Sequence, residues 1–186
     1  MQPLIHKHIP KTTKEIFEQL SEKRELEENP KWEVPVIDSY NSLVTKEEYL
    51  KSLMKPFYTR KSSEPEKEFM NLLDKSDKVK WWYKNRETER KYFAVLRIDG
   101  QSFYPDFIIQ FKDESIGIFD TKSGMTAKDA KERAEGLQKY IKEQHKKGKK
   151  LWGGISIYVT GTWRYNENEL YEYKPNDLSN WIVLEL

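Results

Sequence analysis

The sequence predicts an α/β fold in which a mixed β-sheet is flanked by helices on both faces. Three observations lead to this prediction. There is a helix signature near residue 62, a run of strand-like segments between residues 79 and 122, and a long amphipathic helix after Thr126 that is followed by another apolar segment. The expected order is helix, three or four strands, helix and strand, which is an αβββαβ core.

The first core helix is marked by its start signal. Ser63 followed three positions later by Glu66 is a capping box, and Pro65 suits the first turn of a helix. Apolar residues recur between positions 69 and 73, so the helix has a face to bury. Glu66 lies on that face and is expected to point towards the sheet.

The segments that follow are rich in β-branched and aromatic residues and are separated by turn residues, which is typical of strands. They are residues 79–83, 92–98, 103–111 and 115–122. Asp99-Gly100 predicts a turn between the second and third segments. Lys112-Asp113-Glu114 predicts a tight connection between the third and fourth.

The long helix is predicted by apolar residues at spacings of three and four, which form one helical face. They are Ala127, Ala130, Ala134, Leu137 and Ile141. Gly148 is expected to end this helix. Residues 155–160 predict a further buried strand, and aromatic segments at 171–173 and 181–186 complete the chain.

Residues 1–61 are expected to form a mainly helical N-terminal extension, and residues 62–186 the domain that carries the chemistry. Capping boxes predict two helices in the extension. One is a polar helix over residues 13–28, and the other follows Thr45 and stops at Pro56. An extended segment over residues 32–37 is expected between them.

The composition excludes several classes of protein. The 186 residues are 37% hydrophobic and 13% aromatic, which is enough apolar material for one sizeable folded domain. No run approaches the ~20 apolar residues of a membrane helix, and the first residues lack the apolar stretch of a signal peptide. We therefore expect an intracellular protein, cytoplasmic or otherwise, with no membrane contact.

The metal-binding side chains available are mostly carboxylates. The chain has no cysteine, which excludes disulfides and thiolate zinc sites, and it has three histidines: His6, His8 and His145. Two of these histidines are near the N-terminus. A metal in the core would be held by oxygen, which points to Mg²⁺ or Mn²⁺.

Two carboxylates and a lysine are brought together if residues 112–114 form a three-residue hairpin loop. In that register Phe111 opposes Ser115, and counting back sets Asp106 directly across from Asp120. Opposed side chains lie within roughly 5 Å on the same face of a sheet. Lys122, two residues after Asp120, projects from that face too.

Opposed carboxylates in apolar strands repel each other and are poorly solvated, so a cation between them is favoured. The backbone carbonyl of Thr121 is a further candidate oxygen ligand. A divalent metal would remove the repulsion between Asp106 and Asp120, and Lys122 could then orient or deprotonate a water molecule. This set of groups suits phosphodiester hydrolysis.

The same residues resemble a known family. Tyr104-Pro105-Asp106-Phe107, followed fourteen positions after Asp106 by Asp120-Thr121-Lys122, resembles the PD-(D/E)xK nuclease superfamily. The closer likeness is to the C-terminal endonuclease domain of type III restriction subunits and related helicase-linked nucleases. Flanking pieces similar to that group are Glu66-Lys67-Glu68-Phe69, the segment at 79–85, and Trp152-Gly153-Gly154-Ile155. The likeness spans roughly residues 50–165 and implies a restriction-endonuclease-like sheet.

By this resemblance, Asp106 and Asp120 would bind magnesium, and Lys122 would position the attacking water. An upstream helical glutamate would complete the catalytic and metal-binding set. We favour Glu66, whose place in a capping box is also a sufficient structural reason for a glutamate, and Glu68 remains the alternative.

Contacts to nucleic acid are expected from basic segments at residues 75–91 and 139–150, although cations at a helix C-terminus also suit the helix dipole. The individual candidates are Gln138, Arg133, Lys84 and Arg86. The prediction is a magnesium-dependent DNA endonuclease domain, with RNA left open, partnered with a helicase or translocase by resemblance. The alternatives are a non-catalytic nucleic-acid-binding or assembly module with the same fold, and a hydrolase of another phosphoester.

Overall fold

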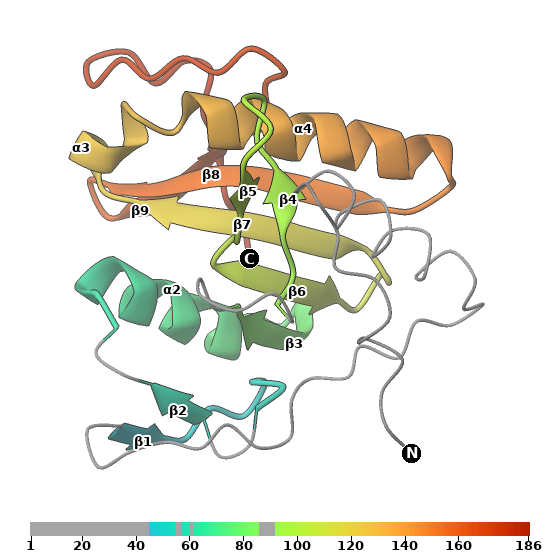
Figure 1. Ribbon diagram of the computed structural model, residues 1–186. Helices are drawn as coiled ribbons and strands as arrows, with labels where there is room; N and C mark the ends of the chain where they lie inside the picture. Colours follow the sequence, from blue (N-terminus) through green and yellow to red (C-terminus); the bar gives the residue numbers. More distant parts are fainter. Residues whose placement is uncertain (1–44, 55–56, 60–61, 86–91) are drawn as a thin grey trace.

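The computed structural model describes residues 45–54, 57–59, 62–85 and 92–186 (Figure 1). Its helices and strands are β1 (Thr45–Glu47), β2 (Phe57–Thr59), α2 (Glu64–Lys75), β3 (Val79–Lys84), β4 (Val95–Leu96), β5 (Ser102–Phe103), β6 (Phe107–Phe111), β7 (Ile116–Lys122), α3 (Gly124–Ala127), α4 (Lys131–Lys146), β8 (Leu151–Val159), β9 (Thr162–Asn166) and β10 (Ile182–Val183). No helix in these ranges combines the length and the apolar character that crossing a bilayer requires.

The centre of the fold is a six-stranded mixed sheet with the strand order β10-β9-β8-β7-β6-β3. Neighbouring strands are antiparallel except β7 and β8, which are parallel. Parallel neighbours need a crossover, and α4 supplies it between β7 and β8. The α/β class is confirmed. The expected elements α2, β3, β6, β7, α4 and β8 follow one another along the chain, with the β4–β5 hairpin and α3 inserted between them.

The helices α2 and α4 cover opposite faces of this sheet (Figure 1). Successive side chains of β6 point to opposite faces of the sheet. Phe107 and Ile109 pack in one apolar cluster with the buried residues of α2. Ile108 packs in a second cluster with Leu137 and Ile141 of α4. The alternation of apolar residues in β6 therefore buries both faces, one under each helix.

Two strands are shorter than expected. Within residues 92–98 only β4 is a strand, and within residues 103–111 the strand β6 begins at Phe107. The short strand β5 pairs with β4 in a separate two-stranded sheet. The chain leaves the extended ladder at Tyr104-Pro105-Asp106 because Pro105 has no backbone N–H to donate.

The expected single helix after Thr126 is instead two helices. The short helix α3 begins at Gly124, capped by Ser123, and α4 begins at Lys131. The side chains of Ser123 and Thr126 form a capping box that starts the four-residue helix α3, and α4 begins separately after it. The last helical residue is Lys146, and Gly148 follows with the positive φ of 76° that its missing side chain permits.

The helix expected between Thr45 and Pro56 is wrong where the structure describes this segment. Thr45–Glu47 is a strand, and the backbone N–H groups of Leu50 and Lys51 donate to the Asp74 carboxylate of α2. These long-range partners replace the hydrogen bonds that a helix would make. The expected helix at 13–28 and the extended segment at 32–37 lie outside the described residues.

Gly136 on α4 is fixed by the β4–β5 hairpin that crosses the helix. A Cβ atom there would meet the Leu96 carbonyl oxygen and the Arg97 Cα, and Ile98 N–H donates to Glu132 O nearby at 3.1 Å. We expect Gly136→Ala to destabilise the fold by about 1–3 kcal/mol, because backbone atoms must move to admit the methyl group.

Chemical denaturation measures this cost. Lys139→Ala, at an exposed position of the same helix, is the matched control and should lie within about 0.5 kcal/mol of the wild type. Equal stability of the two variants would contradict the close approach of hairpin and helix.

Candidate functional site

The site is built on the β6–β7 hairpin, and its register is the one expected. Phe107 pairs with Phe119 and Ile108 with Ile118, while Phe111 N donates to Ser115 O at 2.9 Å. The ladder ends at the Phe107–Phe119 pair, one residue short of Asp106 and Asp120, and Asp106 bonds to Thr121 there.

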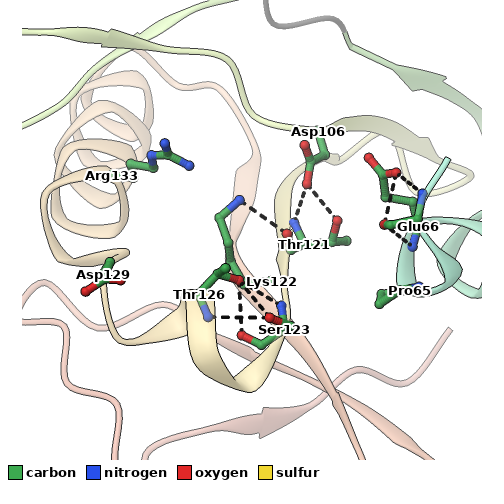
Figure 2. Close-up of a pocket in the computed structure, with 10 residues that line it drawn as sticks. Pro65, Glu66, Asp106, Thr121, Lys122, Ser123, Thr126, Asp129 and Arg133 are labelled. Carbon is green, nitrogen blue, oxygen red and sulfur yellow. Dashed lines mark hydrogen bonds between the residues drawn. The ribbon is translucent and has the colours of Figure 1, made fainter. Parts of the chain in front are cut away.

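Asp106 is buried just before β6 and is fixed by the end of β7. Its Oδ2 accepts hydrogen bonds from Thr121 N at 2.7 Å and from Thr121 Oγ1 at 2.6 Å (Figure 2). Both bonds go to one oxygen. The Asp106 carboxylate is thereby held at the point where β7 ends.

Asp120 lies beneath the surface and is paired with Lys122. The two side chains form an ion pair with Nζ 2.7 Å from Oδ2, and Asp120 is 2% exposed. The same Nζ donates to the Thr121 carbonyl oxygen at 3.2 Å. The lysine ammonium thus lies against two of the oxygens that were expected to attract a metal ion.

The electrostatics of Asp120 favour its neutral form. Burial and, next, the nearby Asp106 charge raise the pKa of Asp120 to about 7, although Lys122 and Arg133 act in the opposite direction. A buried carboxylate near another carboxylate is poorly stabilised without an added cation. This supports the expected repulsion between the two aspartates.

A cleft of about 490 Å³ lies at the end of β7 (Figure 2). It is lined by Ser63, Pro65, Glu66, Asp106, Thr121, Lys122, Ser123, Thr126, Asp129 and Arg133. The structure therefore gathers Glu66, Asp106, Thr121 and Lys122 around one cleft. Asp120 is not among the lining residues, but its ion-pair partner Lys122 is.

Glu66 lies on the cleft wall but already has partners. Its Oε2 accepts from Ser63 N at 2.7 Å, and its Oε1 forms an ion pair with Lys84 Nζ at 3.0 Å. Burial alone would raise the pKa of Glu66, but the Lys84 charge and the Ser63 donors outweigh it and the pKa is lowered. The structure places Glu66 at the cleft, while Glu68 is an exposed residue outside its lining.

The four candidates for nucleic-acid contact are placed differently. Arg133 lines the cleft. Gln138 is buried and donates to Gly153 O at 2.8 Å, so it holds α4 against β8. Lys84 pairs with Glu66 and donates to Ser62 Oγ at 3.0 Å. Arg86 lies outside the described residues.

The donors at the site fit an oxygen-liganded metal of the magnesium type. In the part of the chain that the structure describes, no three His, Cys, Asp or Glu side chains are grouped as a metal site. What remains are the carboxylates of Asp106 and Asp120 and the Thr121 carbonyl oxygen. One or two carboxylates are typical for Mg²⁺, which keeps several water ligands.

Five residues of the cleft were not among the predicted site residues: Ser63, Pro65, Ser123, Thr126 and Asp129. Ser123 N donates to Thr126 Oγ1 at 3.0 Å in the cap of α3. The Ser-x-x-Thr spacing just after Lys122 is a helix-start signal that could have located Ser123 and Thr126. Asp129 lies in the link between α3 and α4, and no sequence signal places it there.

Comparison of the chain with protein-family models, with curated protein sequences and with solved structures gives no match.

The Lys84–Glu66 pair can be tested by stability. We expect Lys84→Met to destabilise the fold by about 1–2 kcal/mol, because a half-buried carboxylate loses its ion pair. Lys80→Met, at an exposed position of the same strand, is the control and should have little effect. Thermal melts of both variants measure the difference. Equal melting temperatures would show that the ion pair contributes nothing to stability.

Proposed function

We propose that the chain is a magnesium-dependent nuclease domain that hydrolyses phosphodiester bonds of DNA, with a restriction-endonuclease-like fold. The observation that carries the proposal is the cleft at the end of β7, where Asp106, Thr121 and Lys122 meet above the buried Asp120. The order α2-β3-β6-β7-α4-β8 supports the proposed fold.

The carboxylates of Asp106 and Asp120, with the Thr121 carbonyl, are the groups that would hold the metal. When bound, Mg²⁺ supplies Lewis-acid polarisation of a phosphate oxygen. The Asp106 carboxylate is held in place through Oδ2 by Thr121, so its orientation does not depend on a ligand. Preorganised ligands avoid the cost of ordering them on binding.

Lys122 is the group that would orient the attacking water or stabilise negative charge on the phosphate. Its ammonium is held between Asp120 and the Thr121 carbonyl and is largely shielded from solvent. A fixed positive charge in a partly dry site stabilises developing negative charge better than one in bulk water. Arg133, on the same cleft, has the planar guanidinium that suits phosphate oxygens.

The proposed partner, a helicase or translocase module, rests on the resemblance of the Asp106 and Asp120-Thr121-Lys122 motifs alone. DNA is proposed over RNA on the same ground. The aromatic residues Trp82 and Tyr83 of the first basic segment are buried in the core, so they offer no stacking surface to bases.

The experiment is incubation of the purified chain with plasmid DNA, structured RNA and a chromogenic phosphodiester, each with and without Mg²⁺. Nicking or linearisation of the plasmid that requires Mg²⁺ and disappears in Asp120→Asn is the expected result. DNA binding without cleavage in any condition would favour the non-catalytic module. Hydrolysis of the small ester alone would favour another phosphoesterase.

A further inference from the structure

Asp106 lies in an irregular segment that needs an external support. It follows Pro105, precedes the first residue of β6, and is outside the paired ladder. Pro105 has no N–H, so this turn cannot be held by an ordinary strand pairing. The position of the Asp106 side chain therefore depends on what binds the backbone carbonyls around it.

Asn85, the residue after β3, binds those carbonyls. Its backbone N–H donates to Asp106 O at 2.7 Å. Its side-chain amide donates to Pro105 O at 2.9 Å and to Phe93 O at 2.7 Å. Asn85 thus binds two successive carbonyls of the turn and joins the turn to the segment that contains Phe93.

The amide orientation of Asn85 follows from its partners. Both side-chain partners are carbonyl oxygens, which only accept, so the NH₂ group must face them. The Oδ1 atom is then directed into the interior, where it has no hydrogen-bond partner among the described residues. An unsatisfied buried oxygen is costly, and this cost offsets part of the stability that the two bonds from the NH₂ group provide.

The support continues from the turn to the cleft. The Asp106 backbone is held by Asn85 on one side, and its carboxylate is held by Thr121 on the other. Because Asp106 is fixed at both ends, a shift of the turn must either move the carboxylate or break its bonds to Thr121. Asn85 itself is 4% exposed and does not line the cleft.

We propose that Asn85 is a positioning residue: its amide holds the Pro105-Asp106 turn so that the Asp106 carboxylate faces the cleft and the end of β7. The relevance to catalysis rests on the proposed nuclease function. The positioning itself concerns the metal-free protein.

The test compares Asn85→Ala with Asn166→Ala. Asn166 is also buried and donates its amide to a backbone carbonyl, Asn180 O at 3.3 Å, and it is not part of the cleft lining. Both variants lose a buried amide clamp, so a general loss of stability affects both. Asn85→Ser, which keeps a hydroxyl donor, provides a milder substitution if Asn85→Ala does not fold.

The first readout is the Thr121 amide in the metal-free protein, followed by NMR shift and hydrogen exchange. Asn85→Ala should move this signal and reduce its protection, and Asn166→Ala should leave it unchanged. The second readout is Mn²⁺ affinity by titration. Removing a group that orients a ligand commonly lowers metal affinity or activity about 10–100-fold.

Lower melting temperature with an unchanged Thr121 amide and unchanged Mn²⁺ affinity would overturn the positioning role. If wild-type protein neither binds Mn²⁺ nor cleaves DNA, the proposed nuclease function fails. The Thr121 amide then still decides whether Asn85 positions Asp106.

Discussion

Asp120→Asn is expected to abolish magnesium-dependent cleavage and to leave the metal-free protein at least as stable as the wild type. The substitution removes a carboxylate ligand from the proposed metal site while keeping the size of the side chain. It also removes a buried charge whose environment favours the neutral form. The loss of the ion pair with Lys122 opposes this gain, but burial and repulsion from Asp106 are the larger effects on the carboxylate.

The difference in stability between Asp120→Asn and the wild type should depend on pH. A carboxyl whose pKa is raised on folding binds more protons in the folded than in the unfolded state between the two pKa values. The metal-free wild type therefore loses the contribution of Asp120 to stability as pH rises from the ordinary value of 3.8 to about 7. Asp120→Asn lacks this loss, so its advantage should grow with pH across that window.

Thermal melts at pH 5 and pH 8 with a metal chelator, together with plasmid cleavage at pH 8 with Mg²⁺, measure the two effects. Asp77→Asn, at an exposed aspartate near the opposite end of β3, is the control and should cleave normally. A strongly destabilised, metal-free Asp120→Asn protein would identify Asp120 as a structural residue.

The part of the site that could be predicted from sequence is local. The register that brings the Asp106 end of β6 to the Asp120 end of β7 follows from the length of one hairpin loop, since side chains alternate with a period of two along each strand. The same alternation in β6 and β7 gives the two buried faces, and the capping box at Ser63 gives the start of α2.

The part that could not be predicted depends on contacts between distant segments. Lys84 appeared as one cation in a basic segment, but it is bound to Glu66 across the gap between β3 and α2. Asn85 carries no sequence signal for the Pro105-Asp106 turn, because its bonds reach backbone carbonyls that any residue type possesses. Likewise, the segment after Thr45 is not a helix, because its backbone N–H groups donate to the distant Asp74 carboxylate.

The ion-pair contacts of the basic residues limit which of them are available at the surface. A net charge of +2 leaves little excess positive charge, and Lys84 and Lys122 each lie in contact with an acidic side chain of the site. If the proposed function holds, these two lysines act within the site, and phosphate binding at the surface is expected from other cations such as Arg133. Because Lys122 is paired when the site is metal-free, its contribution should appear in the rate and not in nucleic-acid affinity.

Lys122→Ala is accordingly expected to remove most of the cleavage rate, by about 10²–10⁴-fold, as is typical for one positioned catalytic group. Metal affinity should be nearly intact or slightly higher, because the ammonium no longer competes for Asp120 Oδ2 and the Thr121 carbonyl. DNA affinity should change little, since one phosphate contact is a small share of the salt-dependent binding. Lys128→Ala, an exposed lysine outside the cleft lining, is the control.

Lys122→Arg separates the two roles of the lysine. Arginine keeps the positive charge but stays protonated and is bulkier, so it cannot act as a base. Single-turnover cleavage, Mn²⁺ titration and DNA binding are measured for Lys122→Ala, Lys122→Arg and the control. Full activity in Lys122→Arg would exclude the base role and leave charge stabilisation or water orientation. Full activity in Lys122→Ala would show that this cleft is not the site of the reaction, because no other group holds the same place between Asp120 and Thr121 in the described residues.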